Sequence, residues 1–196
     1  MAAAAILLLT VSVSLIGLTV APRLIGWNLF RPYWLLPRRE YWTPIGCGFV
    51  HADLLHLLFN SMTFWFFAFG LQRMIGSLRF TALYLVGLLA SAAGTWLRHR
   101  REPEYATLGA SGAVLAVLFA SIVYFPRQSI VILPLPVPIP APWFALAYLG
   151  FSFFAAHRPR GRINHDAHFV GALAGLAFVA LTDPSVFARA LRAVLH

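Results

Sequence analysis

The sequence predicts an all-α membrane protein in which six transmembrane helices form one bundle. Hydrophobic residues make up 60% of the 196-residue chain, and charged residues only 11%. Soluble domains carry about a quarter charged residues, so a soluble globular fold is excluded. Apolar runs of roughly 20 residues, the length that crosses a bilayer, recur along the whole chain. We therefore expect residues 1–196 to form a single integral membrane domain.

The first predicted span is the apolar run Ala2–Val20. It lacks the positively charged start of a cleaved signal peptide, so we interpret it as a membrane helix. The connection that follows, Pro22–Phe49, is long and rich in Trp, Tyr, Arg and Pro. Such residues favour the headgroup region of a bilayer, and we expect this connection to lie at the membrane surface.

The next three spans are apolar runs bounded by polar residues. The second, about Asp53–Leu71, contains the stretch LLHLLFNSMTFWFFAFGL. The third is about Phe80–Leu97, and the fourth is about Ser111–Phe125. Arginine-bearing connections separate these runs, as is typical of segments at the edge of a membrane.

A proline-rich segment precedes the fifth span. In LPLPVPIPAP (Leu133–Pro142), prolines alternate with apolar residues. Proline lacks a backbone N–H and resists helix interiors, so we expect this segment to be extended. The segment has few backbone N–H groups that could lack a hydrogen-bond partner, which lowers the free-energy cost of lying in or near the bilayer. The fifth span is then about Ala141–Ala156, and the sixth about Asp166–Leu181.

The charge pattern also fits a membrane protein. All fifteen basic residues are arginines, against six acidic residues. A net charge of +9 would suggest nucleic acid in a soluble protein. Here the arginines cluster in connections, where they contact lipid headgroups, and we expect the lipid bilayer rather than nucleic acid as partner. The single cysteine, Cys47, excludes an internal disulfide and argues against a cysteine-built metal site.

Polar side chains gather near the beginnings of the second, fourth and sixth spans. In a six-span chain these three helices begin on the same side of the membrane, so their polar residues lie at similar depth. Polar groups inside a bilayer are costly, face the bundle interior and are candidates for function. They are His51, His56 and Asn60 near the second span, Ser111 at the fourth, and His165, Asp166 and His168 at the sixth.

A serine beside a neutral imidazole is the minimum for nucleophilic catalysis, because the imidazole takes the hydroxyl proton and later returns it to the leaving group. Ser111 and His168 fit these roles. His56 and Asn60 share a helix face and can donate to an oxyanion, together with backbone N–H groups around residues 109–111. Asp166 lies about 200° around the helix from His168, so we predict a dyad without a carboxylate.

Three glycines fit this arrangement. Gly109 permits backbone angles that other residues avoid. Gly171 and Gly175 follow His168 on nearly the same helix face and form a seam of small residues that lets the fourth helix approach closely. Taken singly, each feature has a structural interpretation: such seams often serve packing alone, and a membrane serine often bonds back to its own helix.

The chain resembles the rhomboid family of intramembrane serine proteases from about Trp42 to Leu181. The resemblance rests on three motifs in the same order, HADLLHLLFN, GASG and AHFVGALAG. Together these motifs are specific, although GASG alone is a weak signal. The residues that match are His51, His56, Asn60, Gly109, Ser111, Gly112, His168, Gly171 and Gly175.

The resemblance implies that Ser111 is the nucleophile and His168 the general base. It implies an oxyanion hole built from His56, Asn60 and the backbone amides of Ser111 and Leu108. His51 would be a supporting hydrogen-bonding residue. The resemblance further implies a hydrated cavity open to one face of the bilayer, substrates that are single-span membrane proteins, and neither cofactor nor metal. The chain is similar to the basic six-helix form of the family.

Two positions depart from the family pattern. The first loop often carries Trp-Arg, where this chain has Trp42-Thr43. An aromatic residue one turn beyond the nucleophile often packs on the catalytic imidazole, where this chain has Leu115. Neither change removes a catalytic group.

An aromatic stripe of Phe144, Tyr148 and Phe151 follows helical spacing in the fifth span. It has two interpretations. The stripe either borders the entry for a substrate, with the proline-rich segment as a joint, or simply faces lipid.

Three other functions are alternatives to proteolysis. A proton-coupled transporter would use the His/Asn cluster as a relay, but the chain lacks the inverted repeats and paired carboxylates expected of one. A haem or metal protein would leave the serine idle, and H-E-x-x-H is absent. A catalytically inactive rhomboid-like protein that binds membrane proteins would be expected to lack Ser111 or His168.

The arginines and the family expectation disagree on orientation. Ten arginines lie on the side that holds the predicted site, and five lie on the other side. The positive-inside tendency turns the site toward the cytoplasm, whereas rhomboid proteases usually open to the extracytoplasmic face. Because several of these arginines lie in the interfacial loop, we expect an extracytoplasmic site, in a bacterial inner or plasma membrane.

Overall fold

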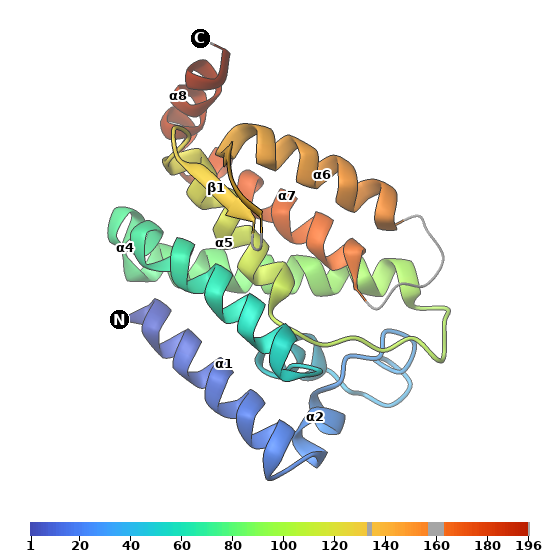
Figure 1. Ribbon diagram of the computed structural model, residues 1–196. Coiled ribbons are helices and arrows are strands. Elements are labelled where there is room, and N and C mark those ends of the chain that lie inside the picture. Colours follow the sequence, from blue (N-terminus) through green and yellow to red (C-terminus); the bar gives the residue numbers. More distant parts are fainter. Residues whose placement is uncertain (133–134, 157–162, 196) are drawn as a thin grey trace.

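The computed structural model describes residues 1–132, 135–156 and 163–195 of the chain and is built mainly of helices (Figure 1). The first two residues of the proline-rich segment lie outside these ranges, and so do residues 157–162, which carry three of the arginines used to weigh orientation. The elements are α1 (Ala2–Thr19), α2 (Arg23–Asn28), α3 (Thr43–Gly46), η1 (Cys47–Phe49), α4 (Leu54–His99), α5 (Ser111–Tyr124), β1 (Ser129–Ile132), β2 (Leu135–Pro140), α6 (Ala141–Ala156), α7 (His165–Thr182) and α8 (Pro184–Leu195).

In the described part of the chain, three helices are long and apolar enough to cross a membrane: α1, α4 and α7. The apolar helices α5 and α6 have 14 and 16 residues, fewer than the roughly 20 that a full crossing needs. The predicted class, a helical membrane protein, is confirmed. The predicted count of six spans is not established by length and composition.

The long helix α4 joins the predicted second and third spans into one 46-residue element. Its backbone leaves the helical conformation at Gly76 (φ 80°, ψ 160°), where a positive φ favours glycine because glycine has no Cβ. The two arms of α4 fold back on each other (Figure 1), and the Phe64 ring contacts the rings of Phe80 and Tyr84 at centroid distances of 6.0 and 5.7 Å. The two predicted spans are therefore the arms of a helical hairpin that turns at Gly76.

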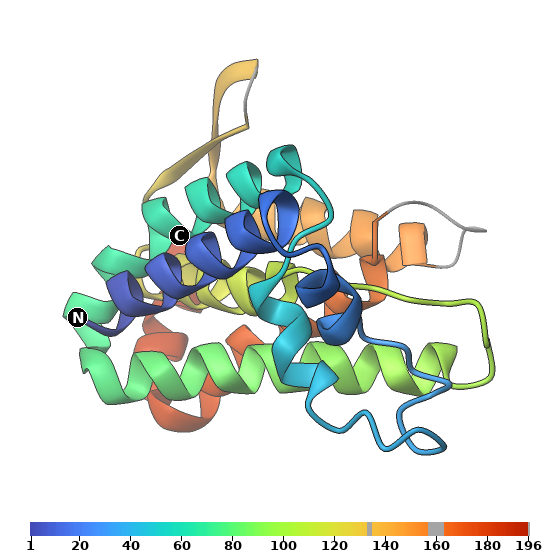
Figure 2. The same ribbon diagram turned by 90° about the horizontal axis from the view of Figure 1, so that it is seen from below.

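Helix α5 occupies the centre of the bundle, between α4 and α7 (Figures 1 and 2). Every residue from Gly112 to Val123 is buried. A Cβ added to Gly171 of α7 would overlap the backbone of Gly112, and one added to Gly175 would overlap the backbone of Ala116. The glycine seam of α7 therefore lies directly against α5.

The connection between α1 and α4 is more ordered than its sequence suggests, because it contains the short helices α2, α3 and η1. Phe30 pairs with Thr107 through two backbone hydrogen bonds of 2.9 Å, which joins the connection to the segment that precedes α5. At the Trp42-Thr43 position, the Trp42 indole donates to the Trp27 carbonyl (3.0 Å), and the Thr43 hydroxyl donates to the Glu40 carbonyl (2.7 Å).

The strands β1 and β2 form an antiparallel hairpin that projects away from the helices (Figure 2). Ser129 lies opposite Pro140, and Ile130 lies opposite Ile139. The prediction that the proline-rich segment is extended is confirmed for residues 135–140.

Helix α8 was not predicted, although its start carries recognisable signals. Proline is favoured at the first position of a helix and aspartate just before it, and Asp183 and Pro184 occupy these positions. The Asp183 carboxylate accepts from the Val186 N–H (3.4 Å) and from the Tyr124 hydroxyl (3.1 Å). Val186 and Phe187 pack against the main core.

Candidate active site

The side chains of Ser111 and His168 meet across the seam between α5 and α7. The Nε2 atom of His168 lies 2.8 Å from the Oγ of Ser111. No bulky group separates the two helices at this level, because Gly112 and Gly171 bring their backbones into contact. The geometry is that of an imidazole able to accept the proton of a serine hydroxyl.

The second ring nitrogen of His168 has a partner that the sequence analysis missed. Its Nδ1 lies 3.0 Å from the hydroxyl of Tyr148 on α6. Asp166 is not this partner, in agreement with the predicted direction of its side chain. Tyr148 was assigned only to the aromatic stripe, in which Phe151 contacts the His165 ring at 5.4 Å. The spacing of the stripe placed these residues on one side of the helix, but it did not tell what that side contacts.

His56 lies beside the backbone that leads into Ser111. Gly109 has a positive φ of 114°, and a Cβ at this position would lie 2.6 Å from Cε1 and 2.8 Å from Nε2 of His56. Glycine is therefore needed there both for its conformation and for the approach of the imidazole. The Asn60 amide donates to the His56 carbonyl (3.1 Å).

Two of the backbone amides before α5 already have acceptors. The Gly109 N–H donates to the Cys47 carbonyl (2.8 Å), and the Ala110 N–H donates to Nε2 of His51 (3.5 Å). The Ser111 N–H belongs to the first turn of α5, where amides have no partner within the helix. Of the amides of residues 109–111, that of Ser111 is the one with no acceptor recorded among the described residues. The oxyanion hole expected of His56, Asn60, Leu108 and Ser111 stays a prediction. Leu108 makes no recorded hydrogen bond to the other described residues.

His51 lies just before α4, as predicted, and its side chain is completely buried. Its Nδ1 lies 2.9 Å from the hydroxyl of Ser14 on α1, and that hydroxyl donates to the Phe49 carbonyl (3.0 Å). Ser14 therefore accepts from Nδ1–H, and Nε2 is left to accept from Ala110. The hydrogen bonds of His51 thus link the backbone before Ser111 to α1 through Ser14, a residue that no motif identified.

Burial of the His51 ring, together with the neighbouring His56, lowers the pKa of His51 from 6.5 to about 3, against the opposing effect of Asp53. At pH values between about 3 and 6.5, the unfolded chain therefore binds one more proton at this residue than the folded chain does. The free energy of unfolding is therefore expected to fall as pH drops from about 6.5 toward 3, by at most ~1.4 kcal/mol per pH unit from this group. Above pH 6.5 the contribution is constant.

Unfolding in detergent between pH 4 and pH 8 tests this dependence. We expect the His51→Gln variant, which cannot titrate at this position, to show a shallower loss of stability below pH 6.5 than the wild type. Equal slopes in the two proteins would contradict the assignment of this proton to His51.

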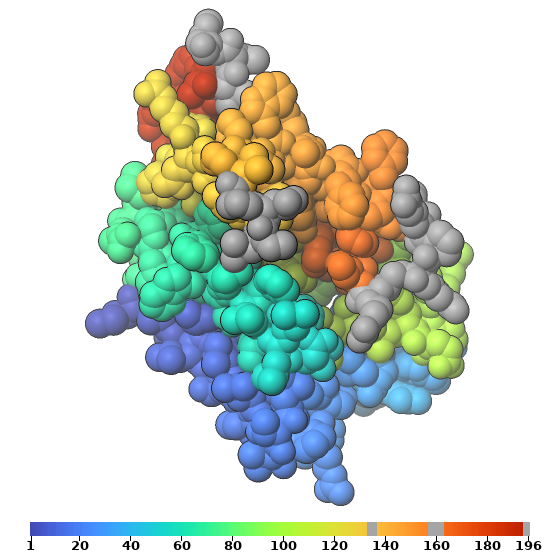
Figure 3. Space-filling view, in the orientation of Figure 1, coloured from blue at the N-terminus to red at the C-terminus, as the bar shows by residue number. Residues whose placement is uncertain are grey.

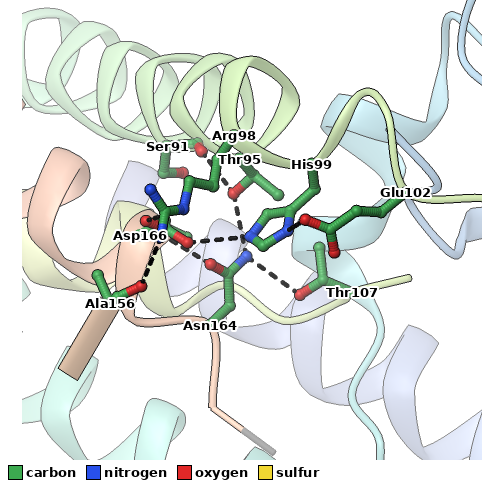
Figure 4. Close-up of polar contacts among 10 residues, drawn as sticks. Ser91, Thr95, Arg98, His99, Glu102, Thr107, Ala156, Asn164 and Asp166 are labelled. Atoms are coloured by element: carbon green, nitrogen blue, oxygen red, sulfur yellow. Dashed lines mark hydrogen bonds and ion pairs between the residues drawn. The ribbon is translucent and has the colours of Figure 1, made fainter. Parts of the chain in front are cut away.

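A polar network joins the beginning of α7 to α4 and to the segment before α5 (Figure 4). Asn164 caps α7 by accepting from the Ala167 N–H (3.0 Å). Its amide donates to the hydroxyl of Thr95 on α4 (3.0 Å) and to that of Thr107 (3.3 Å). Because His168 follows Asn164 by one helical turn, these contacts fix the height of the imidazole relative to α4.

The second half of this network surrounds His99, near the end of α4 (Figure 4). Its Nε2 lies 3.0 Å from Asp166, and its Nδ1 lies 3.2 Å from Glu102. The ring stacks on Tyr105 at a centroid distance of 3.6 Å. Arg98 also approaches Asp166, at 3.9 Å. The sequence analysis did not find this network, because its members come from α4, the following loop and α7.

A cavity adjoins the nucleophile, and its lining includes Leu108, Gly109, Ser111, Asn164 and Ala167. On the molecular surface, Figure 3 shows a narrow hollow between the beginning of α4 (teal) and the beginning of α7 (orange-red). Among the described residues, no group of three or more His, Cys, Asp or Glu side chains could hold a metal ion.

Comparison with known proteins gives the affiliation of the chain. Residues 38–184 match the Rhomboid domain family. The chain is 30% identical over 179 residues to Rhomboid protein 1, mitochondrial, of Saccharomyces cerevisiae. This match covers 87% of this chain and 51% of the yeast protein. It is 30% identical over 142 residues to the human presenilin-associated rhomboid-like protein, mitochondrial, covering 67% of this chain and 35% of that protein.

It is also 29% identical over 86 residues to the rhomboid protease GluP of Bacillus subtilis, covering 44% of this chain and 16% of that protein. The chain thus spans about half the length of the yeast relative and smaller shares of the other two. The family match covers most of the chain and includes all three motifs. This membrane protein belongs to the rhomboid family.

Proposed function

We propose that this protein is a serine-type intramembrane endopeptidase that cleaves the transmembrane helices of membrane-protein substrates. The observation that carries the proposal is the 2.8 Å distance between Ser111 Oγ and His168 Nε2, at the meeting point of two apolar helices. The similarity to a relative named a rhomboid protease adds support.

In this proposal α1, the two arms of α4, α5, α6 and α7 are the six membrane-crossing segments. The short central helix α5 begins at Ser111 and is surrounded by longer helices. The nucleophile would therefore lie below the membrane surface, and the adjoining cavity would admit water to it. Water is required because hydrolysis inside a bilayer otherwise lacks its second reactant.

The reaction would proceed by acyl transfer. The Oγ of Ser111 attacks the carbonyl carbon of the scissile peptide bond while Nε2 of His168 accepts the hydroxyl proton. The Ser111 amide and the His56 ring donate to the oxyanion. When the C–N bond breaks, His168 returns the proton to the leaving amine. Water then attacks the resulting ester while His168 accepts its proton, and His168 returns that proton to the Ser111 oxygen as the acyl C–O bond breaks and the carboxylic acid product leaves.

The substrate must expose its backbone to Ser111. A regular helix hides its carbonyls in hydrogen bonds, so we propose single-span substrates that carry small or helix-breaking residues near the cleaved bond. Entry beside α6 is consistent with the positions of Phe144 and Tyr148 on the α6 face that packs beside α5.

Vesicles that contain the purified protein and a single-span model substrate test the proposal. We expect two product fragments, together with labelling by a fluorophosphonate that maps to the peptide carrying Ser111. Labelling at another residue would refute the nucleophile. Binding of the substrate without cleavage or labelling would favour the alternative of an inactive, membrane-protein-binding relative.

Replacing His56 with alanine is expected to lower kcat by about 10²- to 10³-fold, the usual cost of removing one oxyanion donor. KM should change little, because His56 would act on the transition state rather than on the bound helix. Initial rates at varied substrate density in vesicles separate the two constants. Thermal unfolding of the variant serves as the control for folding, and a normal kcat in a folded variant would exclude His56 from the oxyanion hole.

We propose that the site opens to the extracytoplasmic face, following the family expectation against the arginine distribution. With six spans, the C-terminus then lies in the cytoplasm. A reporter enzyme fused to the C-terminus tests this, and an extracytoplasmic reporter would reverse the orientation.

A further inference from the structure

The hydroxyl of Tyr148 occupies a fixed position beside His168. Its distance from Nδ1 is 3.0 Å. The tyrosine ring packs against Phe144 at a centroid distance of 5.6 Å and against Phe119 at 5.9 Å. Leu115 belongs to the same buried cluster. Packing of the ring thus sets where the oxygen lies, independently of the bond to histidine.

The chemistry of the dyad dictates what this oxygen must do. Nε2 of His168 can accept the Ser111 proton only if it is unprotonated, so the neutral ring must carry its proton on Nδ1. Once the proton arrives, the imidazolium is a donor at both nitrogens. The partner of Nδ1 must therefore be an acceptor before and during proton transfer, and a phenol oxygen can accept.

A second acceptor besides His168 is available to the hydroxyl hydrogen of Tyr148. Ser152 lies one turn further along α6, beside the Tyr148 hydroxyl, and is fully buried. Its Oγ has no hydrogen-bond partner in the part of the chain that the structure describes, so it is an acceptor toward which the phenol hydrogen of Tyr148 can turn. With that hydrogen turned away from His168, a lone pair of the phenol oxygen faces Nδ1–H.

The other candidates for orienting the histidine are engaged elsewhere or apolar. Asp166 bonds to His99. The His165 ring lies 5.8 Å from the His168 ring in an edge-on arrangement. Leu115, one turn beyond the nucleophile, can offer only apolar contact. Among the described residues, the polar contacts of the His168 ring are Ser111 and Tyr148.

We propose that Tyr148 is the positioning residue of this active site: its oxygen holds His168 in the tautomer protonated at Nδ1 and accepts the hydrogen bond of the imidazolium. The inference rests on the proposed protease function. In this arrangement the Tyr148 oxygen on α6 takes the place that a carboxylate holds in a catalytic triad. It adds no charge inside the membrane.

The variant Tyr148→Phe tests the proposal, because it removes only the oxygen and keeps the ring between Phe119 and Phe144. Hydrogen bonds to charged groups are the stronger ones, so kcat for a model substrate in vesicles should fall by about 10- to 100-fold with little change in KM. Tyr124→Phe is the matched control, because it removes a hydroxyl that bonds Asp183 beyond the far end of α5. Its kcat should equal that of the wild type.

A spectroscopic readout separates failure of this inference from failure of the proposed function. In 15N-histidine NMR spectra, with the His168 signals assigned through His168→Ala, the wild type should show the ring protonated at Nδ1. Tyr148→Phe should lose that preference. An unchanged tautomer, or a kcat within about twofold of the wild type in a folded variant, would overturn the role of Tyr148. If the wild type cleaves nothing, the protease proposal fails, while the NMR comparison still decides whether Tyr148 sets the tautomer.

Discussion

The Ser111→Ala variant is expected to lose both substrate cleavage and fluorophosphonate labelling, with a fall in kcat of about 10⁴- to 10⁶-fold. The reason is chemical, because among the described residues Ser111 supplies the one hydroxyl in hydrogen-bond contact with Nε2 of His168. The loss of one serine hydroxyl should cost only about 1 kcal/mol of folding free energy, so the variant should remain folded. Cleavage assays in vesicles and thermal unfolding in detergent measure the two effects.

The matched control is Ser121→Ala, which removes a buried hydroxyl from the same helix, ten residues further along. It should retain the wild-type rate. Cleavage that survives in Ser111→Ala, or that disappears equally in both variants, would show that Ser111 is not the nucleophile.

The second large effect is expected for Gly171→Val. A Cβ at this position would lie 2.8 Å from the Cα and C atoms of Gly112 and closer still to its carbonyl oxygen. Backbone atoms cannot turn aside as a flexible side chain can, so α5 and α7 must separate. Overpacking in a dense core costs about 1–3 kcal/mol, and we expect the upper end of this range. The same separation breaks the contact between Ser111 and His168.

Thermal unfolding and the rate of Ser111 labelling measure the two consequences, and the chain offers a close control. Gly150 lies on α6 with no atom within 4 Å of an added Cβ, so Gly150→Val should change both quantities little. A Gly171→Val variant that unfolds and labels as the wild type does would show that the seam does not set the dyad geometry.

Much of the fold was predictable because apolar runs are local properties of a sequence. The bounds of α1, α6 and α7 agree with the predicted spans to within about one residue. The hairpin of α4 was less predictable. Residues 72–79 were expected to connect two spans, whereas the helices continue through this segment except at Gly76.

The site was only partly predictable, for a different physical reason. Ser111 and His168 could be paired because helices of equal direction place their ends at equal depth, and because glycine spacing marks which face of α7 packs closely. Tyr148 could not be paired in this way. Helix α6 is apolar on all sides, so its sequence pattern does not tell how the helix is rotated about its axis. Ser14 and Thr95 were missed because a lone hydroxyl in an apolar helix carries no signal of its partner.

Backbone hydrogen bonds join the connection between α1 and α4 to the segment that precedes α5, and this has a physiological consequence. Phe30 shares two backbone hydrogen bonds with Thr107. The Cys47 carbonyl accepts a hydrogen bond from the N–H of Gly109, which precedes Ser111 by two residues. The composition of this connection predicts that it lies among lipid headgroups, and these hydrogen bonds link it to the backbone beside Ser111. In the proposed protease, lipid composition and lateral pressure would consequently change the turnover rate through this link.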